Sequence, residues 1–143
     1  MTPAYFDSSA IVKLYANELH HEAVRDLAAV PICTSLARVE VAAAFFGKSR
    51  SGEITVGVAE VLRDVFLADW IEGRFLHIAP DEQIETEAAH LVSVYMVRGF
   101  DAIHLATALA ARRAVPGLAL FVCFDKRLSQ AAVGEQFELL SVT

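Results

Sequence analysis

Short apolar segments of the β type alternate with helical patterns along the whole chain, and this alternation limits the possible folds more than any other feature. The β-type segments contain β-branched or aromatic residues and lie at 4–6, 30–34, 75–78, 118–124 and 138–140. Between them, apolar residues recur at helical spacing. Such alternation is typical of α/β proteins with a largely parallel sheet, so we expect that fold class.

The helices that this pattern predicts cover residues 9–17, 20–29, 36–48, 56–71, 81–99, 101–114 and 126–133. Two stretches within them, 36–47 and 102–111, are rich in Ala and apolar on nearly every side. A helix of this kind is packed on more than one side. We therefore expect the sheet, other helices or a second subunit to cover both stretches, and we expect a homodimer.

The length of the chain and of its uncharged stretches limits the number of domains and the possibility of a membrane span. The 143 residues are 55% hydrophobic, which is enough for a full core, and we expect residues 1–143 to form a single domain. The longest stretches without Asp, Glu, Lys or Arg, 27–37 and 114–124, are shorter than the roughly 20 apolar residues that span a bilayer. A secretory signal has basic residues before its apolar run, and none precedes the first apolar run here. We expect a cytoplasmic protein without a membrane span.

The cysteines and the net charge narrow the chemistry. Cys33 and Cys123 lie in apolar runs without the spacing of a zinc finger, so we interpret both as buried thiols. The formal net charge is −6, which argues against a broad phosphate-binding surface. That argument depends on where the 18 acidic residues lie.

Four of these acids interrupt or end apolar segments. Asp7 ends the first strand, Glu40 lies within an apolar helix, Asp101 opens an Ala-rich helix, and Asp125 ends the run 118–124. Burial of an unpaired charge at such positions is costly. Each acid therefore needs a partner or a function.

The predicted topology brings the four acids together. Asp7 and Asp125 emerge at the carboxyl ends of parallel strands, where open α/β sheets bind ligands. Asp101 faces the same crevice if its helix begins there, and Glu40 points inward from its helix. The helix stripe that contains Glu40 also contains Leu36, Val39, Ala43 and Gly47.

Clustered carboxylates repel one another, so the cluster needs raised pKa values or a cation. Ligand sets made only of oxygen suit Mg²⁺ or Mn²⁺. Cations held in this way can activate a water and stabilise the leaving oxygen in phosphodiester cleavage. The pattern thus indicates a metal-dependent nuclease.

Simpler structural roles are open to each acid. Asp7 and Asp101 are suited to capping the helices that follow them. Asp125 can open a turn. Glu40 can pair with a nearby cation, Arg38 or Lys13.

Four segments resemble PIN-domain proteins, and most closely the VapC family of toxin ribonucleases. In chain order they are 5–15 (YFDSSAIVKLY), 34–44 (TSLARVEVAAA), 101–108 (DAIHLATA) and 123–128 (CFDKRL). The resemblance implies a PIN-like α/β/α sandwich on a mainly parallel, short-stranded sheet. It also implies an Mg²⁺- or Mn²⁺-dependent site that cleaves RNA and is formed by Asp7, Glu40, Asp101 and Asp125.

The resemblance also suggests partners and neighbouring residues. It implies a homodimer and a cognate VapB-type antitoxin, whose docking surface the helices 36–47 and 56–71 resemble. Ser8 or Ser9 resembles the hydroxyl residue that follows the first acid in the family, where it can orient a carboxylate or a water, or form a turn or cap. Many relatives carry Thr where this chain has Cys123, so that hydroxyl is missing.

His104 lies on the same helix face as Asp101, and we favour a role in the core or beside the acids over that of a general base. The basic residues near the acids can contact phosphates or form ion pairs: Lys13, Arg38, Lys126 and Arg127.

The sequence therefore predicts an Mg²⁺-dependent endoribonuclease toxin, and the alternative is a catalytically inactive PIN-fold binding or regulatory module. A dehalogenase-like phosphatase would need Asp at position 9, which is Ser, and a receiver domain would need adjacent acids near the first strand.

Overall fold

The strands predicted from the sequence form a parallel sheet in the computed structural model, which describes residues 1–142. Within these residues the sheet has five strands in the order β3-β2-β1-β4-β5, and every neighbouring pair is parallel. The strands are β1 (Thr2–Phe6), β2 (Ala29–Thr34), β3 (Leu76–Ile78), β4 (Leu120–Val122) and β5 (Glu138–Leu139). The expected α/β class with a parallel sheet is confirmed.

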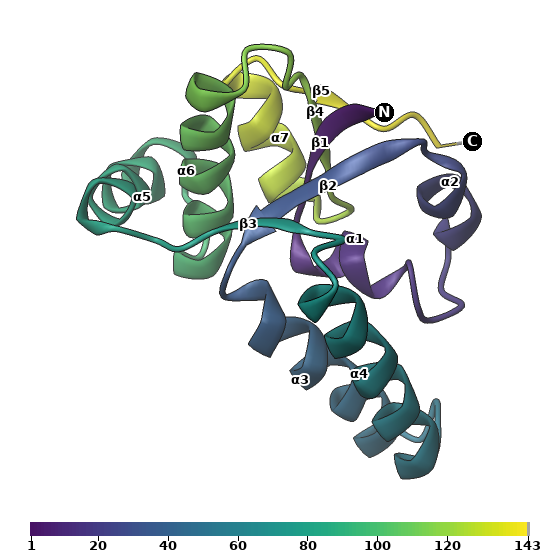
Figure 1. The fold of residues 1–143 in the computed structure, drawn as a ribbon. Coiled ribbons are helices and arrows are strands. Elements are labelled where there is room, and N and C mark those ends of the chain that lie inside the picture. Colours follow the sequence, from purple (N-terminus) through teal and green to yellow (C-terminus); the bar gives the residue numbers. More distant parts are fainter. Residues whose placement is uncertain (143) are drawn as a thin grey trace.

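Helices cover both faces of the sheet (Figure 1). One side carries α1 (Ser8–Val12), α2 (His21–Asp26), α3 (Ala37–Arg50) and α4 (Val56–Ile71), and the other carries α5 (Glu82–Tyr95), α6 (Gly99–Ala114) and α7 (Lys126–Gly134). Successive residues of β1 point to opposite faces, so Tyr5 belongs to the core under α5–α7 and Phe6 to the core under α1–α4. The two cores give the α/β/α sandwich that the resemblance implied.

Several helix boundaries differ from the prediction. The expected helix over 9–17 is only α1, because the amides of Leu14 and Tyr15 donate to carbonyls three residues back and tighten the chain into a turn. The helix expected over 20–29 ends earlier, since residue 29 pairs in β2. The helix expected to end at Gly99 ends at Tyr95, with Met96 in the left-handed region, and Gly99 instead begins α6.

The two Ala-rich helices differ in how they are covered. In α6, eight residues are buried, as expected for a helix packed on several sides. In α3 only Ala37, Val41 and Phe45 are buried, and Val39 is 69% exposed. The sheet and the neighbouring helices of this chain therefore do not cover α3 on every side, and the buried stripe lies one residue away from the predicted one. Helices α3 and α4 pack together as an arm that extends from the sheet (Figure 1).

Other expectations concern membranes and thiols. Within residues 1–142, no helix has both the length and the apolar character that a membrane crossing requires. Cys33 and Cys123 are both free and buried, as predicted, and burial raises the pKa of each thiol to about 12.

Candidate functional site

The four acids lie where helices begin at the carboxyl edge of the sheet. Asp7 follows β1 and Asp125 follows β4, and each is the N-cap of the next helix. Glu40 lies in the first turn of α3 and Asp101 in the first turn of α6. Four segments that are far apart in the sequence therefore contribute one carboxylate each to the same region.

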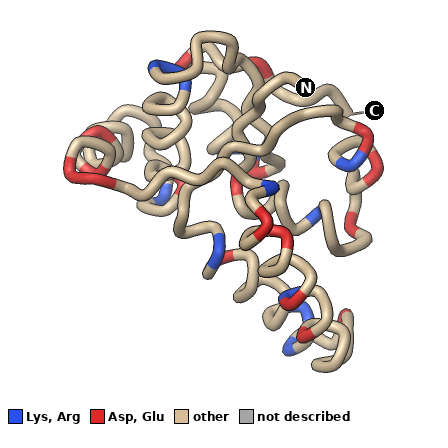
Figure 2. The backbone as a smooth tube through the Cα atoms, in the orientation of Figure 1, with Lys and Arg blue, Asp and Glu red and all other residues tan. Residues whose placement is uncertain are grey.

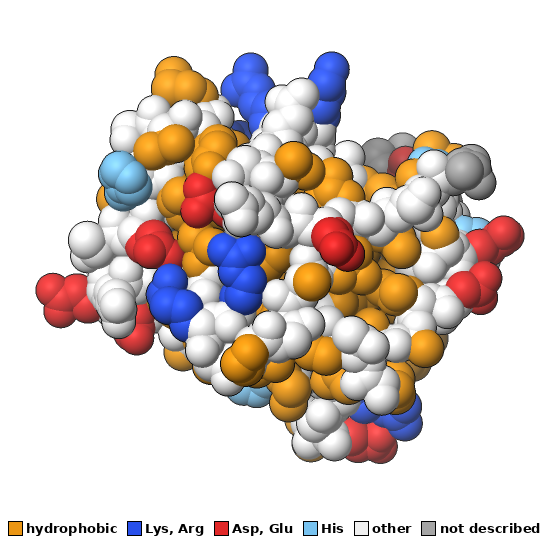
Figure 3. All heavy atoms as spheres, turned by 90° about the horizontal axis from the view of Figure 1, so that it is seen from above, with side chains coloured by type: hydrophobic (Ala, Val, Ile, Leu, Met, Phe, Trp, Pro, Cys, Tyr) orange, Lys and Arg blue, Asp and Glu red, His pale blue; other side chains and the backbone are white. Residues whose placement is uncertain are grey.

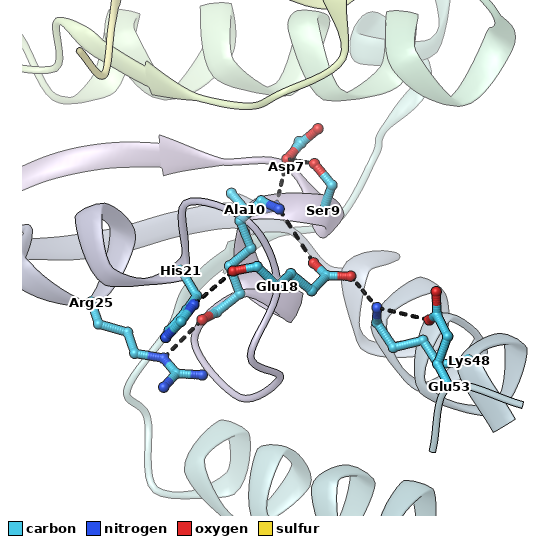
Figure 4. Close-up of polar contacts among 9 residues, drawn as sticks. Asp7, Ser9, Ala10, Glu18, His21, Arg25, Lys48 and Glu53 are labelled. Carbon is cyan, nitrogen blue, oxygen red and sulfur yellow. Dashed lines mark hydrogen bonds and ion pairs between the residues drawn. The ribbon is translucent and has the colours of Figure 1, made fainter. Parts of the chain in front are cut away.

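Asp7 is buried and held by two hydrogen bonds. Only 5% of it is exposed, and its Oδ1 accepts from the amide of Ala10 at 2.9 Å and from the hydroxyl of Ser9 at 2.8 Å (Figure 4). Burial raises the pKa of this carboxyl and the charge of Asp101 adds to the effect, although His104 and the two hydrogen bonds oppose it. Asp7 is thus a helix cap, as one interpretation suggested, and also a buried acid that is costly to ionise.

Glu40 is held by a chain of side-chain hydrogen bonds that ends in the core. The hydroxyl of Ser8 donates to its Oε1 at 2.7 Å, and Nε2 of His104 lies 2.9 Å from the same oxygen. Nδ1 of His104 lies 2.9 Å from the hydroxyl of Tyr5, and both of these residues are buried. Because a carboxylate only accepts, Nε2 of His104 carries the hydrogen of the contact with Glu40.

These contacts decide between the interpretations of Glu40. Burial raises the pKa of its carboxyl, but the hydrogen bonds from His104 and Ser8 outweigh burial, so the pKa is lowered. The alternative in which Glu40 pairs with Arg38 or Lys13 is not formed, since its partners are Ser8 and His104. Lys13 pairs with Glu18 instead, at 3.3 Å.

Asp101 and Asp125 face an exposed arginine. Asp125 accepts from the amide of Leu128 at 2.9 Å through Oδ1. Arg98 contacts the other oxygen of Asp125 through Nη2 at 3.6 Å, and Oδ2 of Asp101 through Nε at 3.5 Å. Burial and the charge of Asp125 raise the pKa of Asp101, and Arg98 and His104 oppose this rise. Asp101 is not the helix cap, because α6 begins two residues earlier.

Sequence reasoning did not single out Arg98, although its spacing to Asp101 is the i, i+3 spacing of a helical ion pair. Cys123 contacts the helix that follows Asp125. Its Sγ lies 3.0 Å from the hydroxyl of Ser129 on α7.

The donor atoms at this edge suit a metal ion, whereas the side chains lie too far apart to share one. Carboxylate oxygens are the ligands that Mg²⁺ prefers, and Asp7 and Asp101 have raised pKa values that a cation would counteract. In the described part of the chain, however, no three acidic, His or Cys side chains lie close enough together to hold one ion. The donor set fits the ion, and the side chains would have to move to enclose it.

Charged side chains are dispersed over the molecule. Acids and bases both occur at several places along the tube of Figure 2, and the face in Figure 3 carries its basic side chains in small groups between apolar ones. Near the site, a pocket of about 410 Å³ is lined by Arg98, Asp101, Asp125, Lys126 and Arg127. This pocket brings three basic side chains beside two of the acids.

A parallel α/β/α sandwich with acids at its carboxyl edge is the arrangement of a PIN domain, and residues 4–134 match the family model of that description. Two curated relatives are "Ribonuclease VapC45" of Mycobacterium tuberculosis (strain CDC 1551 / Oshkosh) and "Ribonuclease VapC49" of Mycobacterium tuberculosis (strain ATCC 25618 / H37Rv). Each is 35% identical over 136 residues, which cover 92% of this chain and 90% of the relative. The chain therefore belongs to the PIN-domain family and, within it, to the VapC proteins.

Proposed function

We propose that this protein is an Mg²⁺-dependent endoribonuclease toxin of a VapBC-type toxin–antitoxin system. The observation that supports the proposal is the placement of Asp7, Glu40, Asp101 and Asp125 at helix starts along one edge of the sheet, from four separate segments. The names of the two relatives support the ribonuclease activity. The reaction is hydrolysis of RNA: water forms a bond to phosphorus, and one phosphorus–oxygen ester bond breaks.

The four acids would hold Mg²⁺ or Mn²⁺, which would supply the Lewis acidity for this hydrolysis. The surrounding side chains orient the acids. Ser9 holds Asp7, and Ser8 and His104 hold Glu40. Because His104 is buried and its Nε2 is engaged with Glu40, it acts as a positioning residue and not as a general base.

The proposed partners are RNA, a VapB-type antitoxin and a second copy of the chain, all in the cytoplasm. The α3–α4 arm is the proposed antitoxin surface. It exposes apolar side chains at helical spacing along α4, namely Val58, Val61 and Val65.

Cleavage of RNA by the purified protein tests the activity. We expect cleavage with Mg²⁺ or Mn²⁺ and none with EDTA, and we expect Asp7→Asn and Asp101→Asn to abolish it. Asp64→Asn, at an exposed site on α4, is the matched control and should cleave like the wild type. Cleavage that persists in EDTA and in both site variants would contradict the proposal.

The alternative is a catalytically inactive PIN-fold module that binds or regulates a partner. The separation of the acidic side chains is the observation in its favour. Failure of the wild-type protein both to bind Mn²⁺ and to cleave RNA would support this alternative.

A further inference from the structure

Arg98 spans two acids that the chain brings together from different helices. It is the N-cap residue of α6, and its guanidinium contacts Asp101 in the first turn of α6 and Asp125 at the start of α7. The side chain is therefore a cation located between two of the proposed metal-binding carboxylates.

These contacts are loose. At 3.5 and 3.6 Å, both distances exceed the usual range of about 2.7–3.2 Å for a hydrogen bond from nitrogen to oxygen. The side chain of Arg98 is 81% exposed, and exposed ion pairs contribute little to stability. Arg98 can therefore leave the carboxylates without disturbing the fold.

A divalent cation would compete with Arg98 for the same oxygens. The two carboxylates repel each other, and one guanidinium neutralises only one of their two charges. A divalent cation neutralises both, and it approaches oxygen more closely than a guanidinium does. Binding of the ion at these acids is therefore expected to displace Arg98.

The displaced guanidinium would remain in a basic setting. Lys126 and Arg127 are exposed and line the same pocket as Arg98. With the two carboxylates neutralised, the charges left around this pocket are positive, in a chain whose formal net charge is −6. Arginine forms paired hydrogen bonds with phosphate, so the pocket suits a phosphodiester group.

We propose that Arg98 is a resident counter-ion of Asp101 and Asp125, that a divalent cation displaces it, and that the released guanidinium then binds a phosphate of the RNA. This inference rests on the proposed function and adds to it a substrate-binding residue. It requires removal of Arg98 to have opposite effects on the two ligands. The metal ion binds more tightly, and the RNA binds more weakly.

The first experiment measures Mn²⁺ binding to the metal-free protein without RNA, by isothermal titration calorimetry. Arg98→Gln should bind Mn²⁺ several-fold more tightly than the wild type. The matched control is Arg113→Gln, which removes another exposed arginine of α6 whose ion pair with Glu87 is also 3.6 Å long. This control should bind Mn²⁺ like the wild type.

The second experiment measures initial rates of cleavage of a single-stranded RNA at saturating Mn²⁺ and several salt concentrations. Arg98→Gln should raise KM several-fold, and the slope of log KM against log salt should fall by about 0.7, the loss of one phosphate contact on a single strand. Arg98→Lys should keep KM near the wild-type value. Its Mn²⁺ affinity should rise, because an ammonium is a point charge that cannot span both carboxylates. The rise should be smaller than that of Arg98→Gln, because lysine keeps the positive charge.

The outcomes separate this inference from the proposed function. If the wild type binds Mn²⁺ in an Asp7-dependent manner but Arg98→Gln binds it equally well or more weakly, the role of Arg98 is overturned and the nuclease proposal stands. An unchanged KM and salt slope would likewise overturn the phosphate contact. If the wild type binds no Mn²⁺, both proposals fail.

Discussion

Glu40 and Asp125 come from the same edge of the sheet, yet the protein holds them in different ways. Glu40 accepts hydrogen bonds of 2.7 and 2.9 Å from Ser8 and His104, and the second continues into the core through Tyr5. Asp125 accepts from the amide that it caps, and its other oxygen makes a long contact with exposed Arg98. We call the first set the inner half of the site, formed by Asp7, Glu40 and their hydrogen-bond partners, and the second the outer half, formed by Asp101, Asp125 and Arg98.

The difference shows that one half of the site is fixed by hydrogen bonds while the other half can rearrange. Breaking a buried hydrogen bond leaves an unsatisfied polar group, so the inner half has one preferred arrangement. An exposed ion pair exchanges readily with water and ions, so the outer half can rearrange at little cost in stability. Substitutions in the two halves should therefore have very different effects on the free energy of unfolding.

The largest expected effect on stability is that of His104→Ala. This change creates a cavity and leaves the Tyr5 hydroxyl and Glu40 without a shared partner, so we expect a loss of about 3 kcal/mol. Denaturant unfolding measures it, with His90→Ala at an exposed site on α5 as the control. Equal stability of the two variants would mean that the inner half is not a fixed unit.

A smaller effect is expected for Tyr5→Phe, which removes one buried oxygen atom. His104 Nδ1 then lacks its hydrogen-bond partner, and we expect a loss of about 1–2 kcal/mol. A nitrogen-detected NMR spectrum should also show a changed distribution of protons between Nδ1 and Nε2 of His104. If stability and the proton position are both unchanged, Tyr5 does not organise the inner half.

Glu18 sharpens the comparison because its exposure resembles that of Glu40, at 25% against 28%, while its partners are charged. Burial raises the pKa of Glu18, but the hydrogen bonds and charges of Lys48 and Lys13 outweigh it, so the pKa is lowered (Figure 4). The resulting stabilisation is present above the unfolded-state pKa of about 4.3 and is lost as the pH falls through the lowered folded-state pKa.

Unfolding of the wild type and Glu18→Gln at several pH values measures this contribution. The variant should be less stable by about 1 kcal/mol at pH 7, and the difference should shrink on acidification. A difference that stays constant down to low pH would show that packing and not charge accounts for it.

The smallest effect is expected for Arg98→Gln. An exposed pair with long contacts should change the free energy of unfolding by less than about 0.5 kcal/mol. A loss as large as that of Tyr5→Phe would remove the distinction between the two halves.

The features that depend on local sequence pattern could be predicted from the sequence. The five strands follow from short β-branched and aromatic runs, and the positions of Asp7 and Asp125 at strand ends follow from those runs. The inward direction of Glu40 was also predictable, although the apolar surroundings of α3 did not reveal which stripe is buried.

The partners of these acids were not predictable from local pattern. Tyr5 and His104 lie 99 residues apart, and their hydrogen bond depends on how α6 packs against the sheet. The contact of Arg98 with Asp125 likewise depends on the meeting of two helix starts. The early end of α1 was missed because a tight turn continues the helical spacing for several residues without forming an α-helix.

The central position of β1 affects when the protein can fold during synthesis. One side of β1 pairs with β2, but the other side pairs with β4, where Ala4 lies opposite Leu120. Ribosomes add about 5–20 residues per second, so β4 is synthesised several seconds after β1 and this side of β1 has no strand to pair with until then. Asp125 follows the same late strand, so a nascent chain has only an incomplete set of site acids until translation has passed β4 and that segment has left the ribosome.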